Sequence, residues 1–261
     1  MAFRLVPILE KIEALYQLPR NRERFSIYLS LLQGKEGKDM VLPISAYNPM
    51  AKEDALLKLQ KLKNLEAEAI ASNVISEINQ KLSQKSEHRI SVVINLADDM
   101  GGSWSSRYTT DYTSKFDFGP ILKRGFCTPY FWTSEDYTHN TIRERVTKSI
   151  LRTLYWLEHG KPKTLEDHIH QESSISLKRK SQMEFSLKNT SIDQFFDEHK
   201  HSEDYGLIFN FLYGDEASEE LNYTAHGIPF LGGFNYAHYL VQKGIGEKFR
   251  VDYQSLLRKP L

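Results

Sequence analysis

The chain has 261 residues, of which 40% are hydrophobic and 26% are charged. This composition is that of a folded protein of one or two domains and argues against a disordered chain. The 34 Lys and Arg residues equal the 34 Asp and Glu residues in number, so the chain lacks the basic surplus that a nucleic-acid-binding protein usually shows.

The single cysteine, Cys127, excludes an intrachain disulfide and a zinc site built from several cysteines. Charged residues interrupt the first 18 residues, and no apolar stretch has the length of a membrane span. We therefore expect neither a signal peptide nor membrane insertion. Together these features predict a cytoplasmic protein.

Apolar residues recur at helical spacing over 3–16, and a second such pattern over 25–32 ends near Gly34. The clearest element is 52–82, where apolar residues are separated by threes and fours and no Gly or Pro occurs. This pattern predicts a long amphipathic helix that is bent or broken near Asn64.

The best strand candidate is 89–96, because it contains a run of β-branched residues. Turn-forming residues follow it, and 97–132 is predicted to be an unusually long irregular loop, rich in Ser, Thr, Tyr, Gly and Pro. Residues 133–136 have the composition of a helix cap, and we expect the helix that follows to end near Glu158.

Several shorter helices are expected in the last hundred residues, where one apolar run is undecided between helix and strand. The helices are predicted over 164–172, from Ser191 onward and within 236–257, and the undecided run is 205–213. We therefore predict a mainly α fold with minor strand content, organised as a single globular domain over 1–261. The polar stretch 173–190 is a weak alternative boundary.

Two adjacent carboxylates, Asp98 and Asp99, follow the predicted strand and precede Gly101 and Gly102. Carboxylates at a strand end, beside glycines that permit close backbone approach, suit an acid, a base or a ligand of a metal ion. Asp98 and Asp99 are therefore candidate catalytic residues. An ordinary turn has the same composition, so a purely structural role is the alternative.

The residues that follow have the chemistry of a polar and aromatic binding site. Arg107 can bind an anionic ligand through two parallel hydrogen bonds, and the rings of Trp104 and Tyr108 can stack on a ligand. Together with Asp111, these residues are predicted to bind a substrate. In the alternative interpretation, Arg107 pairs with Asp99 or Asp111.

Histidines supply further candidates. His226, in an apolar loop rich in glycine, is a candidate catalytic base, with a hydrogen-bonded structural histidine as the alternative. Two more clusters combine histidine with carboxylate, and they predict either a metal site or solvated surface. Their members are His168, His170, Glu172, Glu198, His199, His201 and Glu203. Cys127 lies among aromatic residues and is predicted to be buried and inert.

The sequence contains no phosphate-binding loop, serine-hydrolase elbow or dinucleotide-binding fingerprint. The favoured hypothesis is an enzyme or small-molecule-binding protein with a site around residues 98–112. The alternative is a non-catalytic interaction or structural protein, in which the helix over 52–82 buries one face against the body or a partner. Cofactor, metal and oligomeric state stay unassigned, and neither nucleic acid nor a membrane is expected as a partner.

Overall fold

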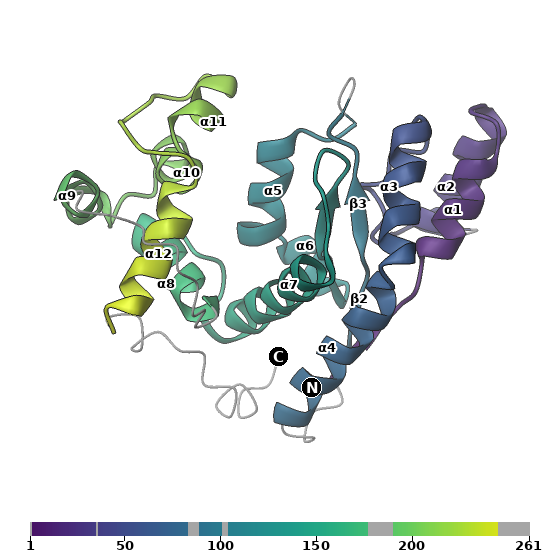
Figure 1. Cartoon of the computed structure of the whole chain (residues 1–261), viewed down its shortest axis with the longest axis horizontal. Coiled ribbons are helices and arrows are strands. Elements are labelled where there is room, and N and C mark those ends of the chain that lie inside the picture. The colour runs from purple at the N-terminus through teal and green to yellow at the C-terminus, as the bar shows by residue number, and fades with distance from the viewer. Residues whose placement is uncertain (1, 35, 83–88, 101–103, 177–189, 245–261) are drawn as a thin grey trace. The chain divides into compact units, whose positions relative to one another are not determined.

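A computed structural model describes residues 2–34, 36–82, 89–100, 104–176 and 190–244 (Figure 1). These residues fall into two compact units, one up to Thr153 and the other from Leu154 onward. The expected single domain stays a prediction. Most of the weak boundary near 173–190 lies outside the described residues.

The described residues form twelve helices and five short strands, which confirms the mainly α fold with minor strand content. The helices that begin in the first unit are α1 (Leu9–Gln17), α2 (Arg22–Gln33), α3 (Glu53–Asn64), α4 (Ala67–Lys81), α5 (Arg107–Phe116), α6 (Gly119–Lys123) and α7 (His139–His159). The second unit contains α8 (Leu165–Ile175), α9 (Thr190–His199), α10 (Tyr205–Tyr213), α11 (Asp215–Glu220) and α12 (Gly232–Gln242). No helix in the described part of the chain is long and apolar enough to cross a membrane.

The strands of the first unit all run parallel. They are β1 (Ala2–Leu5), β2 (Arg89–Val92), β3 (Asn95–Ala97), β4 (Phe126–Cys127) and β5 (Tyr130–Trp132), with β2 between β1 and β4 and with β3 paired to β5. Two further hydrogen bonds, from Val93 N–H to Cys127 O and from Asn95 N–H to Pro129 O, bridge the gap between the β2–β4 pair and the β3–β5 pair. The two pairs therefore form a nearly continuous ladder. Residues from Ile90 to Ala97 are buried, as expected for a parallel strand covered on both faces.

The predicted strand over 89–96 is therefore present, but it is divided into β2 and β3. At the division, the Ile94 carbonyl accepts a hydrogen bond of 2.8 Å from the Tyr47 hydroxyl. The predicted helix over 3–16 is wrong at its start, because Ala2–Leu5 form β1. Pro7 disfavours helical backbone just before it, and β1 pairs with a strand almost ninety residues away, which helical spacing does not reveal.

The long helix predicted over 52–82 is broken, as expected, just beyond Asn64. Glu66 has a left-handed backbone with φ of 51°, which ends α3 and starts α4. The buried residues of these helices include Leu59, Leu62 and Val74, so their apolar sides pack within the first unit. This burial occupies the face that the interaction hypothesis assigned to the body or a partner.

The predicted irregular loop over 97–132 is wrong, because this segment contains α5, α6, β4 and β5. The helix α5 is mostly polar and buries only Tyr112 and Phe116, one turn apart, so its sequence has little helical signal. β4 and β5 have only two and three residues and are defined by pairing with upstream strands. Tertiary packing thus overrides weak local preference here.

In the second unit, the undecided run 205–213 is a helix, α10, capped by Asp204 and buried from Ile208 to Tyr213. The expected helices over 164–172 and from Ser191 correspond to α8 and α9, and α8 starts with a capping box between Thr164 and Asp167. The last predicted helix begins at Gly232, and its expected extension over 249–257 lies outside the described residues.

Candidate ligand-binding site at the ends of two strands

The site lies where β3 and β5 end side by side. Ala97 is in register with Trp132, and Thr133 N–H donates to Ala97 O at 3.0 Å. Asp98 and Asp99 therefore leave the sheet at the same edge as Thr133 and its successors. In open sheets of parallel strands, this carboxyl edge is where ligands usually bind.

Asp99 is held by side chains from the neighbouring strand end. Its carboxylate accepts hydrogen bonds from Thr133 Oγ1 at 2.9 Å, from Ser134 N–H at 3.0 Å and from Ser134 Oγ at 2.6 Å. Arg107 Nη1 completes the shell at 3.2 Å, and only 5% of the Asp99 side chain is exposed. Burial by itself favours the neutral acid, but the bonds from Ser134 and Thr133 and the Arg107 charge outweigh it and lower the pKa of Asp99.

Asp98 is bound by neutral donors. Its Oδ2 accepts from Asn48 Nδ2 at 2.8 Å, and its Oδ1 accepts from Met100 N–H and lies 3.3 Å from Thr133 Oγ1. Only 9% of Asp98 is exposed. The two adjacent carboxylates therefore differ in chemistry, because Asp99 faces a cation and Asp98 faces only neutral hydrogen-bond donors in the described part of the site.

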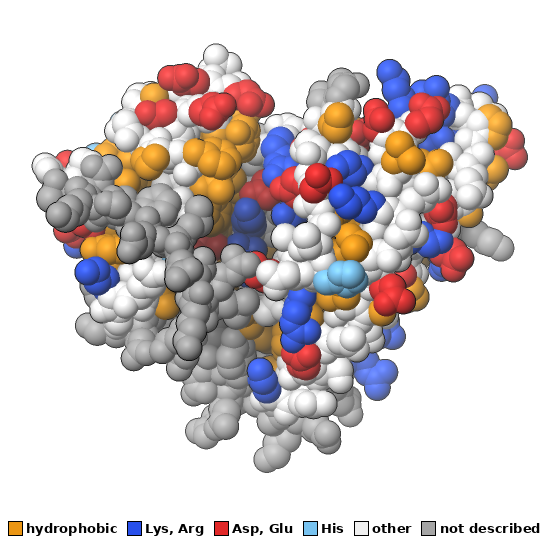
Figure 2. All heavy atoms as spheres, viewed as in Figure 1, with side chains coloured by type: hydrophobic (Ala, Val, Ile, Leu, Met, Phe, Trp, Pro, Cys, Tyr) orange, Lys and Arg blue, Asp and Glu red, His pale blue; other side chains and the backbone are white. Residues whose placement is uncertain are grey.

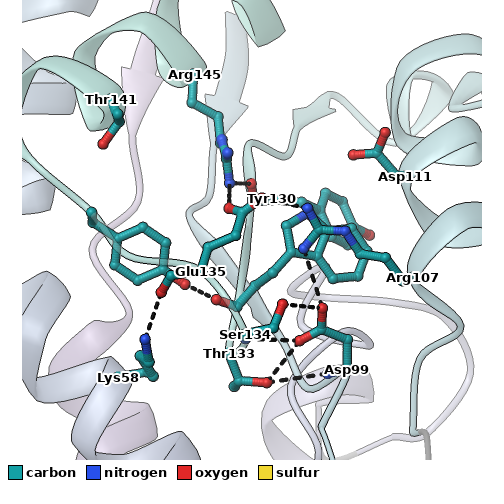
Figure 3. Close-up of polar contacts among 12 residues, drawn as sticks. Lys58, Asp99, Arg107, Asp111, Tyr130, Thr133, Ser134, Glu135, Thr141 and Arg145 are labelled. Atoms are coloured by element: carbon teal, nitrogen blue, oxygen red, sulfur yellow. Dashed lines mark hydrogen bonds and ion pairs between the residues drawn. The ribbon is translucent and has the colours of Figure 1, made fainter. Parts of the chain in front are cut away.

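Arg107 joins this strand edge to a second charged pair (Figure 3). Its guanidinium lies over the Trp132 ring, 4.3 Å from the ring centre, and pairs with both Asp99 and Glu135. The other oxygen of Glu135 accepts from Arg145 Nη1 at 2.6 Å. Burial opposes the charge of Arg107, but Glu135, Asp111 and Asp99 together outweigh it and raise the pKa of the guanidinium. Arg107 is therefore a permanent cation clamped between two carboxylates and an aromatic ring.

The predicted pairing of Arg107 with Asp99 is thus confirmed, whereas the segment around it is a helix instead of a loop. Tyr108 and Asp111 lie on α5 with Arg107, and both are half-buried. Asp111 pairs with Lys115 one turn later and also stabilises the Arg107 charge. Their proposed contact with a substrate stays a prediction.

Trp104 is 44% exposed, and its ring is fixed at two points. Its Nε1 donates to Ser45 O at 2.7 Å, and its ring meets the Tyr28 ring edge-on at 6.3 Å between centres. The next residue, Ser105, donates its N–H to Asp98 O at 3.3 Å. Trp104 is therefore an anchored, partly exposed indole attached to the Asp98 turn.

His226 belongs to the second unit, so its predicted role beside Asp98 and Asp99 stays a prediction. Its backbone N–H donates to Asp215 Oδ1 at 3.0 Å, and its exposed ring lies 5.4 Å from the Phe195 ring between centres. Asp215 also accepts from Gly227 N–H and Ile228 N–H, which fixes the loop that carries His226. These contacts fix the backbone of the loop, and the role of the imidazole stays a prediction.

The histidine and carboxylate clusters meet at Glu166, which lies one helical turn before His170 on α8. Its carboxylate lies 3.8 Å from His170 Nε2 and 3.5 Å from His201 Nδ1. His168 is buried, and burial lowers its pKa, while its Nδ1 lies 2.7 Å from Thr164 O. Across the ranges that the structure describes, no three His, Cys, Asp or Glu side chains are grouped as a metal site.

Cys127 is buried in β4, as predicted. Burial raises the pKa of its thiol to about 12, against the smaller effects of Thr153 and Arg152. Such a thiol is a poor nucleophile at neutral pH, which agrees with the inert role expected from the sequence.

Sequence reasoning missed Glu135 and Arg145 and misassigned 133–136 as helix caps. The helix α7 begins only at His139, where Thr138 and Thr141 exchange hydrogen bonds. Thr133 and Ser134 instead donate hydrogen bonds to the carboxylate of Asp99, which follows the neighbouring strand β3. The sequence did contain a signal for this arrangement, the short apolar run at 130–132. If that run is read as a strand parallel to 95–97, the residues after each strand lie at the same edge.

Comparisons with protein-family models, with curated proteins and with solved structures found no match to this chain, so the geometry of the site alone supports its functional interpretation.

Proposed function

We propose that this protein binds a small polar molecule at the edge formed by the ends of β3 and β5. The observation that carries the proposal is the charged network at this edge, in which Asp99, Arg107, Glu135 and Arg145 are linked in one chain of ion pairs. Preorganised charged and aromatic groups at the carboxyl ends of parallel strands are the usual components of a ligand site.

Stability alone is a weak reason for such a network. Burying paired charges costs about as much desolvation free energy as their attraction returns, so buried ion pairs contribute little net stability. The lowered pKa of Asp99 keeps it ionised at neutral pH, and its hydrogen-bond partners occupy both oxygens. These features support a positioning role for Asp99, which holds Arg107 and the two strand ends in place for a ligand.

The test is thermal melting of the protein against a library of polar small molecules and divalent ions. A ligand at a hundred times its Kd stabilises the folded state by about 2.7 kcal/mol, which is readily detected. We expect a hit to raise the Tm of the wild type and to have a much smaller effect on Arg107→Ala. Arg124→Ala is the control, because Arg124 forms a more exposed ion pair with Asp39. Equal shifts in both variants would place the binding elsewhere.

We also propose a cellular location and a partner class for the protein. The balanced charge of the chain and the buried thiol of Cys127 support a cytoplasmic protein that acts on a small molecule without nucleic acid. On the face in Figure 2, basic and acidic side chains are interspersed over the helices of the first unit. Cell fractionation with antibody detection tests the location, and recovery in the membrane pellet would contradict it.

A further inference from the structure

On the basis of the proposed function, we infer that the ligand carries a cationic group, such as a primary ammonium, that binds at Asp98 beside Trp104. The starting point is that the guanidinium groups at this edge are already paired. Arg107 is shared by Asp99 and Glu135, and Arg145 binds Glu135 and Tyr130 O. An added anion would therefore compete with carboxylates that are already in place.

Asp98 differs from the other acids of the site because no ion pair reaches it within the described residues. Its partners are the Asn48 amide, the Met100 N–H and the Thr133 hydroxyl, all of them neutral. Burial raises the pKa of Tyr16, the charge of the buried Arg24 lowers it and that of Asp98 raises it. The Arg24 guanidinium is held by backbone carbonyls. Asp98 is thus a carboxylate at this edge that no guanidinium pairs within the described residues, and a cation gains most there.

The surface beside Asp98 supplies a second, independent feature. Trp104 and Met100 are 44% and 46% exposed, and both flank the Asp98 turn. The Trp104 indole is fixed by Ser45 and Tyr28, so it presents an aromatic surface that loses little entropy on binding. Indole rings attract ammonium and guanidinium groups, and methionine thioethers adapt to apolar portions of a ligand.

The neutral partners of Asp98 also fix its orientation. Asn48 donates to Asp98 through Nδ2 and accepts from Met50 N–H through Oδ1, so both ends of the amide are used. A carboxylate can accept about four hydrogen bonds. An incoming ammonium can therefore add donors to Asp98 without displacing the Asn48 amide.

The experiment compares two probes of similar size and opposite charge, n-butylammonium and butyrate, by calorimetry or by chemical shifts of the tryptophan indole N–H. We expect the wild type to bind n-butylammonium in preference to butyrate, with binding that weakens as salt is added. Asp98→Asn should weaken n-butylammonium binding by about tenfold or more, because a charge-assisted contact is lost. Asp136→Asn is the matched control, since Asp136 is an exposed acid already paired with Lys58 and Lys61.

The selectivity of the wild type tests the inference without any variant, which keeps it falsifiable if Asp98→Asn folds poorly. Preference for butyrate that depends on Arg107 would overturn the cation inference and leave the proposed function standing. Binding of neither probe at millimolar concentration would also overturn the inference, while the library screen against Arg107→Ala decides the proposed function separately. Equal n-butylammonium affinity in Asp98→Asn and wild type would exclude Asp98 as its site.

Discussion

Ser134 donates from its hydroxyl to Asp99 Oδ2 over 2.6 Å, so a side chain that leaves β5 holds the carboxylate that leaves β3. The same residue donates its backbone N–H to the other oxygen of Asp99 at 3.0 Å. This two-point contact ties together two segments 35 residues apart in the chain. It fixes the carboxylate with which Arg107 pairs.

We expect Ser134→Ala to lower the free energy of unfolding by about 1–3 kcal/mol, because a buried carboxylate loses a strong donor. Ser30→Ala is the control, since the Ser30 hydroxyl is exposed and donates to the Ser26 carbonyl one turn earlier. The control should change stability by less than about 0.5 kcal/mol. Urea denaturation followed by fluorescence measures both, and equal effects would show that Ser134 does not support Asp99.

Glu135→Gln should destabilise the protein by about 1–3 kcal/mol, because Arg107 and Arg145 then share a neutral partner. The expected loss is below that for a fully buried pair, since these side chains are 24–32% exposed. Glu77→Gln breaks an exposed pair with Arg143 and should cost less than about 0.5 kcal/mol. A double-mutant cycle with Arg145→Gln should reveal a coupling free energy, and strict additivity would contradict the bridging role.

Stability should fall in acid partly through Asp99. The pKa of Asp99 is lower in the folded than in the unfolded chain, so its contribution is complete above the unfolded value of about 4. It is then lost as the pH falls through the folded pKa. The pKa values of Asp167 and Asp215 are lowered as well and act in the same direction. The free energy of unfolding, measured with urea between pH 3 and 7, should fall less steeply in acid for Asp99→Asn than for the wild type. An equal slope in both would refute the contribution assigned to Asp99.

In the second unit, Gly214→Ala should destabilise the fold strongly. Gly214 has φ of 93°, and an added Cβ would lie 2.5 Å from Pro229 O, in the loop that Asp215 holds. Gly160→Ala separates the two causes, because Gly160 has a similar φ of 83° but nothing within 4 Å of an added Cβ. We expect about 1–2 kcal/mol for Gly160→Ala from backbone strain alone and clearly more for Gly214→Ala. Thermal melting of both variants provides the comparison.

Cys127 should resist alkylation in the folded protein. With a thiol pKa of about 12 and a buried position, almost no accessible thiolate exists at pH 8. We expect iodoacetamide to modify the protein slowly in buffer and completely in 6 M guanidinium, as measured by intact mass. Rapid modification of the native chain would require Cys127 to be reachable and activated.

The sequence was most informative where one segment contains its own structural signal. The apolar spacing over 52–82 predicted a long helix bent or broken near Asn64, and Glu66 supplies that break with its left-handed backbone. The charge and aromatic content after residue 97 indicated the region of the site, and the Arg107–Asp99 pair was among the alternatives. These features depend on neighbours within a few residues, which helix periodicity and turn chemistry encode directly.

Elements that form only by pairing with residues distant in the sequence could not be predicted from local patterns. β1 and β5 are too short to have a clear pattern, and each is a strand because it pairs with β2 or β3. Glu135 enters the site only because β5 ends beside β3. The sequence by itself thus determined the mainly α class and the chemistry of the segment around Asp98. The tertiary structure alone decided which charges meet, because parallel pairing joins strand ends across long connections that local sequence does not specify.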